Sequence, residues 1–310
     1  DVHLVERDFP ASGTSRACDG LVLLWDKQNP TELDLARQSL ALWHQLDNDL
    51  DVEFGFERRG TILLAEGDEQ MQAGLEKAQS LQQIGQKAEV LNGQDLQSLE
   101  PGLAADLPGG ILFPDDLQVD PRRATLGMLS AAQQNGLKLH VRQEVIAIQR
   151  GSPHDQAISK VITQDMEIAT PILICAAGVW SNQIAQLVDL ELPIQPRKGH
   201  ILVSAKAPGL IRHSLLEGSY ATTVGSAAQD TQVAFVAEMT PQGRLLLGSS
   251  REFTGFDRRV SLTVIRAIAQ RAARFLPRLA HSSVIRSYAG LRPWSPDHLP
   301  LIGPCAQAPG

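Results

Sequence analysis

The sequence predicts an α/β fold in which a second domain is inserted into a Rossmann-like dinucleotide-binding domain. Val2–Arg7 is a short apolar strand that carries Glu6 near its end, and a loop rich in Ser, Thr and Gly follows, Asp8–Gly20. In dinucleotide-binding folds, an acid at the end of the second strand holds the ribose hydroxyls. The glycine-rich phosphate loop belongs about 20 residues earlier, so we expect the domain to be incomplete. The pieces between residues 52 and 100 do not resemble parallel βαβ units and predict the inserted domain.

Composition excludes several classes of function. The 310 residues are 43% hydrophobic and 20% charged, which is ordinary for a globular protein with a large core. The net charge of −7 argues against non-specific binding to nucleic acid or to an anionic membrane. The three cysteines are widely spaced and form neither a metal motif nor a disulfide framework, which favours the cytoplasm. The sequence contains no run of about 18 apolar residues, so no transmembrane segment is expected.

The first half of the chain contains several predicted helices and strands. Asn29–Leu46 has an apolar face and a cap at Thr31 or Asn29, so it predicts a helix. The remaining elements of this part are a pair of strands within Phe54–Ala65, an amphipathic helix Glu69–Ile84 and a short helix Asn92–Leu99.

The middle of the chain predicts a helix followed by strands. Asp120 caps a helix that begins at Pro121 and ends near Gln134. Leu137–Val141 and Val145–Gln149 are the next strands. Ile168–Ser181 predicts a buried strand that runs into Ala-Ala-Gly, where small residues let the backbone approach a ligand closely. Cys175 on this strand is expected to be a buried thiol.

The next segment reaches residue 275. Leu192–Val203 predicts a strand broken by Pro196 and Gly199, and Arg244–Ser250 predicts another strand. Lys198 and His200 lack a paired acid or nucleophile at suitable spacing, so structural or surface roles are expected for them. Val260–Phe275 is an amphipathic helix whose basic face we expect to be solvated.

The C-terminal stretch Arg286–Gly303 combines arginines, prolines and glycines in an apolar tract. Arg286–Leu291 predicts a strand, and the prolines that follow predict a turn at Arg292. A guanidinium at a strand end can hold a carboxylate or phosphate through two hydrogen bonds. The same guanidinium could instead pair with a structural carboxylate such as Asp297.

Three stretches, VERDFPASGTS, CAAGVWS and YAGLRPWSPDHLPLIG, resemble the D-amino-acid oxidase-like flavoproteins. That family includes glycine oxidase, sarcosine oxidase and the amine-oxidising subunit of hydrogen cyanide synthase. The resemblance implies FAD as cofactor and a chain that lacks both ends of its FAD-binding domain. That domain would comprise residues 1–51, 101–190 and 285–310. An α+β substrate domain on an antiparallel or mixed sheet would comprise residues 52–100 and 191–284.

The resemblance also implies site residues. Arg292 would anchor the substrate carboxylate. The implied cofactor contacts fall into three groups: Glu6 and Arg7 at the adenosine, Thr14, Ser15, Arg16, Gly20 and Leu21 along the loop, and Val145, Ala177, Gly178 and Trp180 further on.

The implied reaction is hydride transfer to FAD from a small amino acid or secondary amine of the glycine, sarcosine or D-amino-acid type. Oxygen or another acceptor would take the electrons, and a homo-oligomer would be compatible. The sequence departs from the family at Phe235, where glycine-oxidase-like members have a tyrosine, and at Glu238, where a base is common. Two alternatives stay open: a flavin-dependent hydroxy-acid or polyol dehydrogenase, and an inactive fragment that cannot retain FAD.

Overall fold

An eight-stranded mixed sheet dominates the part of the chain that the computed structural model describes, which is residues 1–27, 29–50, 52–151, 157–220 and 230–310. The strand order is β15-β11-β14-β13-β12-β3-β5-β4, and each neighbouring pair is antiparallel except the parallel pair β12 and β3. The strands are β3 (Thr61–Ala65), β4 (Glu89–Asn92), β5 (Gly109–Phe113), β11 (Gln195–Lys206), β12 (Ser214–Glu217), β13 (Gln232–Met239), β14 (Arg244–Arg251) and β15 (Val284–Trp294). The predicted mixed sheet is therefore confirmed.

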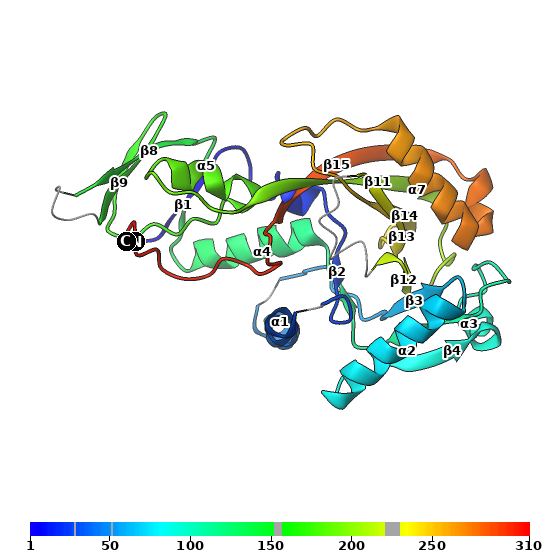
Figure 1. Cartoon of the computed structure of the whole chain (residues 1–310). Coiled ribbons are helices and arrows are strands. Elements are labelled where there is room, and N and C mark those ends of the chain that lie inside the picture. Colours follow the sequence, from blue (N-terminus) through cyan, green and yellow to red (C-terminus); the bar gives the residue numbers. More distant parts are fainter. Residues whose placement is uncertain (28, 51, 152–156, 221–229) are drawn as a thin grey trace.

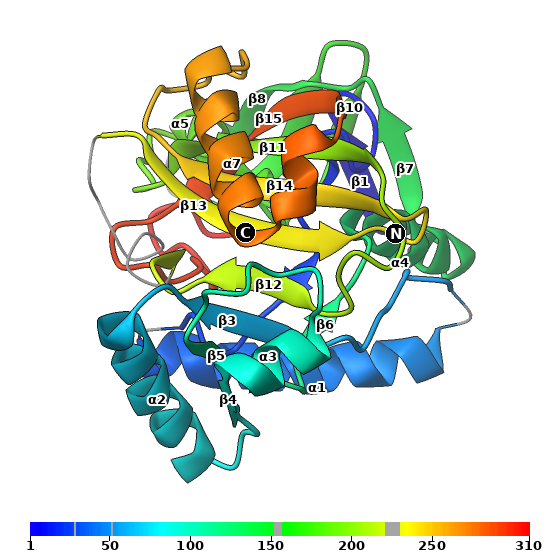
Figure 2. The same ribbon diagram turned by 90° about the vertical axis from the view of Figure 1, so that its right-hand side faces the viewer.

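Helices cover both faces of this sheet. Helices α3 (Gly93–Leu99) and α7 (Leu262–Phe275) pack on one face, where Leu96, Ile268 and Phe275 join a cluster with Leu202 and Phe235. Helix α2 (Asp68–Gln83) packs on the other face in a second cluster. Figure 2 shows α7 lying across β13 and β14, with α2 and α3 near β3 and β5. At the β15–β11 end of the sheet, the face opposite α7 contacts the loop before β2 (Leu21–Val22), which is described below.

Smaller sheets and helices make up the rest of the fold (Figure 1). The strand pairs are the parallel β1 (His3–Glu6) with β7 (Lys138–Val141), and the antiparallel β2 (Leu21–Val22) with β6 (Leu117–Gln118). A three-stranded sheet contains β8 (Val145–Arg150), β9 (Ile158–Thr163) and β10 (Glu167–Ala169). The helices are α1 (Pro30–Asp49), α4 (Pro121–Gln134) and α5 (Ser181–Gln186), with short 3₁₀ turns η1 (Thr14–Arg16), η2 (Gly178–Trp180) and η3 (Pro277–His281).

The predicted caps place the helix starts correctly. Asn29 rather than Thr31 caps α1, because its side chain accepts a hydrogen bond from the Thr31 N–H. The Asp120 side chain accepts hydrogen bonds from two backbone N–H groups of the first turn of α4. Gly136, at a φ of 93°, follows the end of α4 in the left-handed region that favours glycine.

Three strand predictions are wrong. Residues 54–60 form no strand and make one isolated bridge, between Glu57 and Gln118. Strand β11 continues through Pro196, and β15 continues past Arg292 to Trp294. Pro196 lies opposite Pro293, so neither strand needs an N–H donor at that position. Strand β15 is also at the edge of the sheet, where proline is tolerated.

The predicted buried strand at residues 168–181 is wrong as well. Strand β10 ends at Ala169, and Cys175 is exposed. The side chains of Ile172 and Ile174 are 66% and 83% exposed. A strand needs a hydrogen-bonded neighbour, and the described residues supply no neighbouring strand for residues 171–177. An apolar run alone therefore does not decide burial.

The basic face of α7 is also not simply solvated. Arg271 Nε donates to Glu217 Oε2 at 2.8 Å, and its guanidinium also pairs with Glu66. The Glu217 side chain is 3% exposed, so this ion pair is largely buried. Arg274 pairs with Glu66 and Asp106. These contacts attach α7 to β3 and β12.

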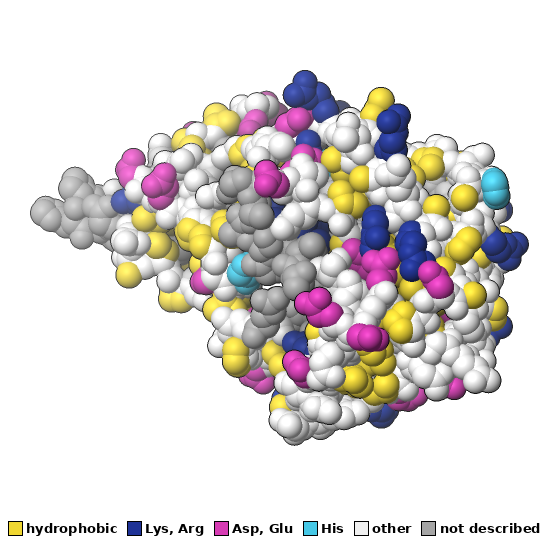
Figure 3. Space-filling view, turned by 45° about the vertical axis from the view of Figure 1, so that its right-hand side comes forward, with side chains coloured by type: hydrophobic (Ala, Val, Ile, Leu, Met, Phe, Trp, Pro, Cys, Tyr) yellow, Lys and Arg dark blue, Asp and Glu magenta, His cyan; other side chains and the backbone are white. Residues whose placement is uncertain are grey.

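Charged side chains of both signs are interspersed on the face in Figure 3. Among the residues with described positions, every helix is too short or too polar to cross a lipid bilayer. The domain boundaries stay a prediction, although β5 and β15 lie in the same sheet as strands assigned to the substrate domain.

Candidate active site at the β11–β15 edge of the sheet

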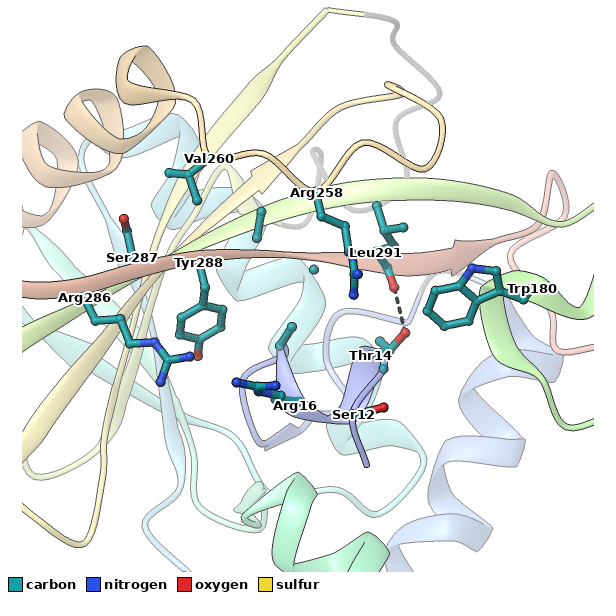
Figure 4. A pocket seen from close by; sticks show the side chains of 14 residues that line it. Ser12, Thr14, Arg16, Trp180, Arg258, Val260, Arg286, Ser287, Tyr288 and Leu291 are labelled. Carbon is teal, nitrogen blue, oxygen red and sulfur yellow. Dashed lines mark hydrogen bonds between the residues drawn. The ribbon is translucent and has the colours of Figure 1, made fainter. Parts of the chain in front are cut away.

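A pocket with a volume of about 310 Å³ lies where the loop before β2 meets strand β15 (Figure 4). Its walls come from that loop, Trp180, the segment before α7 and the strand itself. Arg16, Arg258 and Arg286 line it with guanidinium groups, and Tyr288 adds a phenol. The volume is at the small end of the range for ligand pockets in proteins, and the lining suits an anionic or polar aromatic ligand.

The loop is fixed to the sheet at both ends. The Thr14 hydroxyl donates to the Leu291 carbonyl at 2.8 Å, the hydrogen bond drawn in Figure 4. Gly290 lies so close to the loop that a Cβ there would be 2.7 Å from the Ala17 Cβ. At the other end, the Gly20 N–H donates to Glu238 Oε2 at 3.0 Å. The loop therefore depends on a sheet more than two hundred residues away in sequence.

A series of side-chain contacts connects the end of β1 to the pocket. The Arg7 guanidinium lies 4.7 Å from the centre of the Trp180 ring and 3.9 Å from Glu144 Oε1. The Trp180 ring in turn lies 3.3 Å from the position that a Cβ on Gly13 would occupy. The Gln143 N–H donates to the Glu6 carbonyl at 3.0 Å. The structure thus brings Glu6, Arg7, Trp180 and the 13–16 loop together, and their contact with FAD stays a prediction.

The other predicted cofactor residues lie at different distances from this group. Val145 begins β8 directly after Glu144, so it is beside the Arg7 contact. Gly178 has a φ of 56°, in the left-handed region, and follows Ala177 at the start of η2. Ser15, Gly20 and Leu21 do not line the pocket. Leu21 packs instead against the apolar cluster under α2.

Arg292 lies on the sheet face that meets the loop. It is opposite Arg197 in the β11–β15 register, two residues from Gly290 on the same face. Its guanidinium lies over Gly199, whose Cβ would be 2.1 Å from Nη1, and Nη1 donates to the Ser250 carbonyl at 3.0 Å. Asp297 is exposed and accepts a hydrogen bond from Leu299 N. Among the ion pairs of the described residues, none joins Arg292 to Asp297.

Two further arginines accompany Arg292, and we call Arg197, Arg251 and Arg292 the arginine cluster. Arg197 and Arg251 are 3% and 4% exposed. Burial, Arg251 and Arg292 together lower the pKa of Arg197 to about 10, so it stays protonated at neutral pH. Burial and the neighbouring Arg292 also lower the pKa of Arg251. The cluster therefore concentrates positive charge in a poorly hydrated place.

Tyr220 and Asp19 border the arginine cluster. The Arg251 guanidinium lies 4.6 Å from the centre of the Tyr220 ring. Burial raises the pKa of Asp19, while the charges of Arg292 and Arg251 oppose that rise. Sequence reasoning missed Arg251, Asp19 and Tyr220. The scarcity of tyrosine was a usable signal, since the chain has two tyrosines and both lie at this site.

Glu238 and Phe235 point to opposite faces of β13. Phe235 is fully buried and stacks on Phe275 of α7, with ring centres 4.7 Å apart, so it does not reach the site. Glu238 is 3% exposed and faces the loop. Burial, and then the nearby charge of Asp19, raise its pKa to about 8, although the Gly20 N–H opposes the rise.

Lys198 and His200 have structural contacts, as predicted, but both are buried rather than at the surface. His200 Nε2 accepts from the Ser261 N–H at 3.0 Å, and Nδ1 lies 2.9 Å from the Ser250 hydroxyl. Burial lowers the pKa of His200, which favours the neutral ring. Lys198 Nζ pairs with Glu252 Oε1 at 3.2 Å.

Comparison with known proteins places the chain in a family. The family described as DAO, FAD dependent oxidoreductase, matches residues 1–310. The chain belongs to this family. Its members are FAD-dependent flavoproteins that include amino-acid oxidases and dehydrogenases, so the predicted resemblance is confirmed.

Individual relatives give the extent of the similarity. The chain is 31% identical to hydrogen cyanide synthase subunit HcnC of Pseudomonas aeruginosa over 287 residues, which is 91% of this chain and 64% of that protein. It is 26% identical to glycine oxidase of Geobacillus kaustophilus over 310 residues, or 97% of this chain and 77% of that protein. The crystal structure of glycine oxidase from Geobacillus kaustophilus superposes with a TM-score of 0.87 at 24% identity, covering 99% of this chain and 80% of that one. The chain thus spans about two thirds of the length of the first relative, and the structural likeness confirms the α/β fold.

Proposed function

We propose that the protein oxidises the C–N bond of a small amino acid or secondary amine, with FAD as the hydride acceptor. The observation that carries this proposal is the position of Arg292. Its guanidinium lies on the sheet face that packs against the 14–20 loop, two residues from the Gly290 contact with Ala17. Relatives named glycine oxidase, D-amino acid dehydrogenase and hydrogen cyanide synthase subunit support an amine substrate.

The residues around the pocket fit FAD. The Glu6 carboxylate accepts from the Asp8 N–H through Oε1, and its second oxygen could accept from a ribose hydroxyl. Guanidiniums such as Arg16 suit phosphate or the polar edge of the flavin ring. The left-handed Gly178 turn and the Trp180 ring would lie against the cofactor. When bound, the flavin would supply the electron sink for the reaction.

Arg292 would bind and orient the substrate. A guanidinium has five N–H donors, and the bond to Ser250 O leaves donors for a carboxylate. Two parallel hydrogen bonds fix both the position and the rotation of the carboxylate. Holding the carboxylate in this way would use binding energy to keep the reacting C–H bond in a fixed orientation toward the cofactor. The Ser250 contact and the Gly199 surface would in turn hold the guanidinium in place.

We assign no protein group as the catalytic base. His200 is neutral and bound on both ring nitrogens, and Lys198 is ion-paired with Glu252. Glu238 is buried and hydrogen-bonded to the loop. An amine that binds in its neutral form needs no proton removal before its C–H bond breaks, and the resulting imine hydrolyses in water.

The test is Arg292→Ala in the intact, FAD-loaded protein. Loss of two charge-assisted hydrogen bonds should cost about 3 kcal/mol or more, which lowers kcat/KM for amino acids at least about 100-fold. The matched control is Arg266→Ala, because Arg266 is exposed on α7. Anaerobic bleaching of the flavin absorption is the measurement, with hydroxy acids and polyols tried beside amino acids.

Each result has a defined meaning. Bleaching by amino acids that Arg292→Ala abolishes while flavin stays bound supports the proposal. Unchanged turnover in Arg292→Ala contradicts the role of the arginine. Bleaching by hydroxy acids and by no amine contradicts the proposed reaction and supports the alternative dehydrogenase.

A further inference from the structure

The pocket described above is a groove along the free edge of strand β15 (Figure 4). Strand β15 is at the end of the large sheet, and among the described strands only β11 pairs with it. The segment before α7, with Arg258 and Val260, lies on one side of β15, and the loop with Thr14 lies on the other. The floor of the groove is therefore the backbone at the edge of a sheet.

Two residues of this edge direct their backbone groups away from β11. Lys198 of β11 makes both of its backbone hydrogen bonds on the side away from β15, so the backbone groups of its partner Leu291 point outward. The Thr14 hydroxyl donates to that outward Leu291 carbonyl. Backbone groups alternate along a strand, so those of Ser287 and Ala289 also point outward. The described residues provide no hydrogen-bond partner for these two N–H and two C=O groups.

Both walls of the groove are held in place. Lys198 Nζ lies 3.6 Å from Asp257 Oδ2 and donates to the Arg259 carbonyl at 3.4 Å. These contacts hold the residues on either side of Arg258. The opposite wall is held by the bond from Thr14 to β15. Because the groove is preformed, a ligand would lose little free energy in ordering it.

The groove carries positive charge on exposed side chains. Arg258 and Arg286 line it from different elements, and both are exposed. Neither arginine occurs among the ion pairs of the described residues, whereas the neighbouring Arg259 pairs with Asp257 at 2.9 Å. The Arg286 guanidinium lies 5.3 Å from the centre of the Tyr288 ring, which orients it without removing its charge. The groove is thus positive on a chain whose net charge is −7.

Charge and backbone together indicate the kind of ligand. A second copy of the chain, paired edge to edge about a twofold axis, would bring the same arginines toward each other, and like charges repel. An extended peptide with acidic side chains meets both features of the groove. Its backbone would pair with Ser287 and Ala289 as an added strand, and its carboxylates would meet Arg258 and Arg286.

We infer that the edge of β15 binds an extended acidic segment of a partner protein by strand addition, and that Arg258 and Arg286 determine its preference for acidic side chains. This interaction surface goes beyond the proposed amine oxidation. Arg292 does not line the groove, and Arg16 and Trp180 are left to the proposed cofactor contacts.

Labelled peptides test the inference on the intact, FAD-loaded protein. Fluorescence anisotropy compares fluorescein-labelled Val-Glu-Glu-Glu-Val with Val-Lys-Lys-Lys-Val and with the acidic peptide N-methylated at every Glu. We expect the acidic peptide to bind at least about 10-fold more tightly than either of the others. The arginines would repel the lysine peptide, and the N-methylated peptide lacks the N–H donors that an added strand needs.

Variants of the groove locate the binding site. Arg258→Gln and Arg286→Gln should each weaken binding of the acidic peptide about 3- to 10-fold, because each removes one charge that faces it. The matched control is Arg266→Gln, on the exposed face of α7, which should change binding by less than about 2-fold. Ala289→Pro removes an outward N–H at a sheet edge, where proline is tolerated, and should also weaken binding.

Each outcome bears on the inference. Equal binding of the acidic peptide and its N-methylated form would show ionic contact alone and overturn strand addition. Equal binding of the acidic and lysine peptides, or unchanged binding in both arginine variants, overturns the selection of acidic side chains. Thermal melting identifies a misfolded variant, and the comparison of the three peptides on the parent protein then decides. If none of the peptides binds, the inference fails, while flavin bleaching by amino acids, measured without peptide, still tests amine oxidation separately.

Discussion

Replacing Glu238 with Gln should remove a pH-dependent destabilisation of the fold. The buried Glu238 carboxyl accepts from the Gly20 N–H, and the charges of Asp19, Asp120 and Glu57 act on it. In the unfolded chain its pKa is 4.5, and in the fold it is about 8. Below pH 4.5 both states hold the proton, so the group does not affect stability.

The sign follows from proton binding. As pH rises from 4.5 to about 8, the folded state keeps a proton that the unfolded state releases, so the free energy of unfolding falls. The full shift corresponds to about 5 kcal/mol at high pH. Gln keeps an acceptor for Gly20 N–H and does not titrate. We therefore expect Glu238→Gln to become more stable than the parent by several kcal/mol as pH rises.

Urea unfolding at about pH 5, 7 and 9 measures the effect, as the difference between variant and parent at each pH. Glu89→Gln is the matched control, because Glu89 is exposed and should leave the pH dependence unchanged. Equal pH dependence in Glu238→Gln and the parent would refute the argument, since it would mean that the carboxyl is ionised in the fold.

Two further predictions concern the packing around the site. Arg271→Met should cost about 3 to 5 kcal/mol, because it leaves the buried Glu217 without its cation, whereas the exposed Arg266→Met should change stability by about 0.5 kcal/mol or less. Adding Glu217→Leu to Arg271→Met should recover most of the loss in urea unfolding, and no recovery would argue against a buried-charge penalty. Gly20→Ala should destabilise by about 1 to 3 kcal/mol, because its Cβ would lie 1.9 Å from the Val119 carbonyl oxygen. A thermal melt that matches the parent would show that the loop moves aside at no cost.

Local signals in the sequence predicted local structure well. Asn29, Asp120 and Gly136 mark helix ends through their own backbone contacts, which depend on a few neighbouring residues. The failures depend on residues far away. Proline was compatible with β11 because Pro293, on another strand, lies opposite Pro196. Burial of Ile174 would require another element to pack against it, and the apolar residues next to it in the sequence do not determine whether such an element is present.

In the candidate site, too, the features that depend on local sequence were predicted, and those that depend on distant residues were missed. Arg292, the loop and the Gly178 turn were predicted from their resemblance to the family's motifs, and the small residues beside Gly178 indicated a close backbone approach. Arg251 and Tyr220 were missed, because their meeting depends on the strand order of the large sheet. Glu238 was noticed, but its hydrogen bond to Gly20 joins residues 218 positions apart. Sequence pattern alone does not reveal such a contact.

Gly199 and Gly290 face each other across β11 and β15, and neither has a side chain to fill the space above it. The Arg292 guanidinium occupies one of these gaps and Ala17 occupies the other. A methyl group at either glycine would thus displace a different partner, the anchor in one case and the loop in the other. The position of the proposed substrate anchor and the docking of the loop are therefore coupled through two missing side chains, so this sheet edge leaves little freedom to change one without disturbing the other.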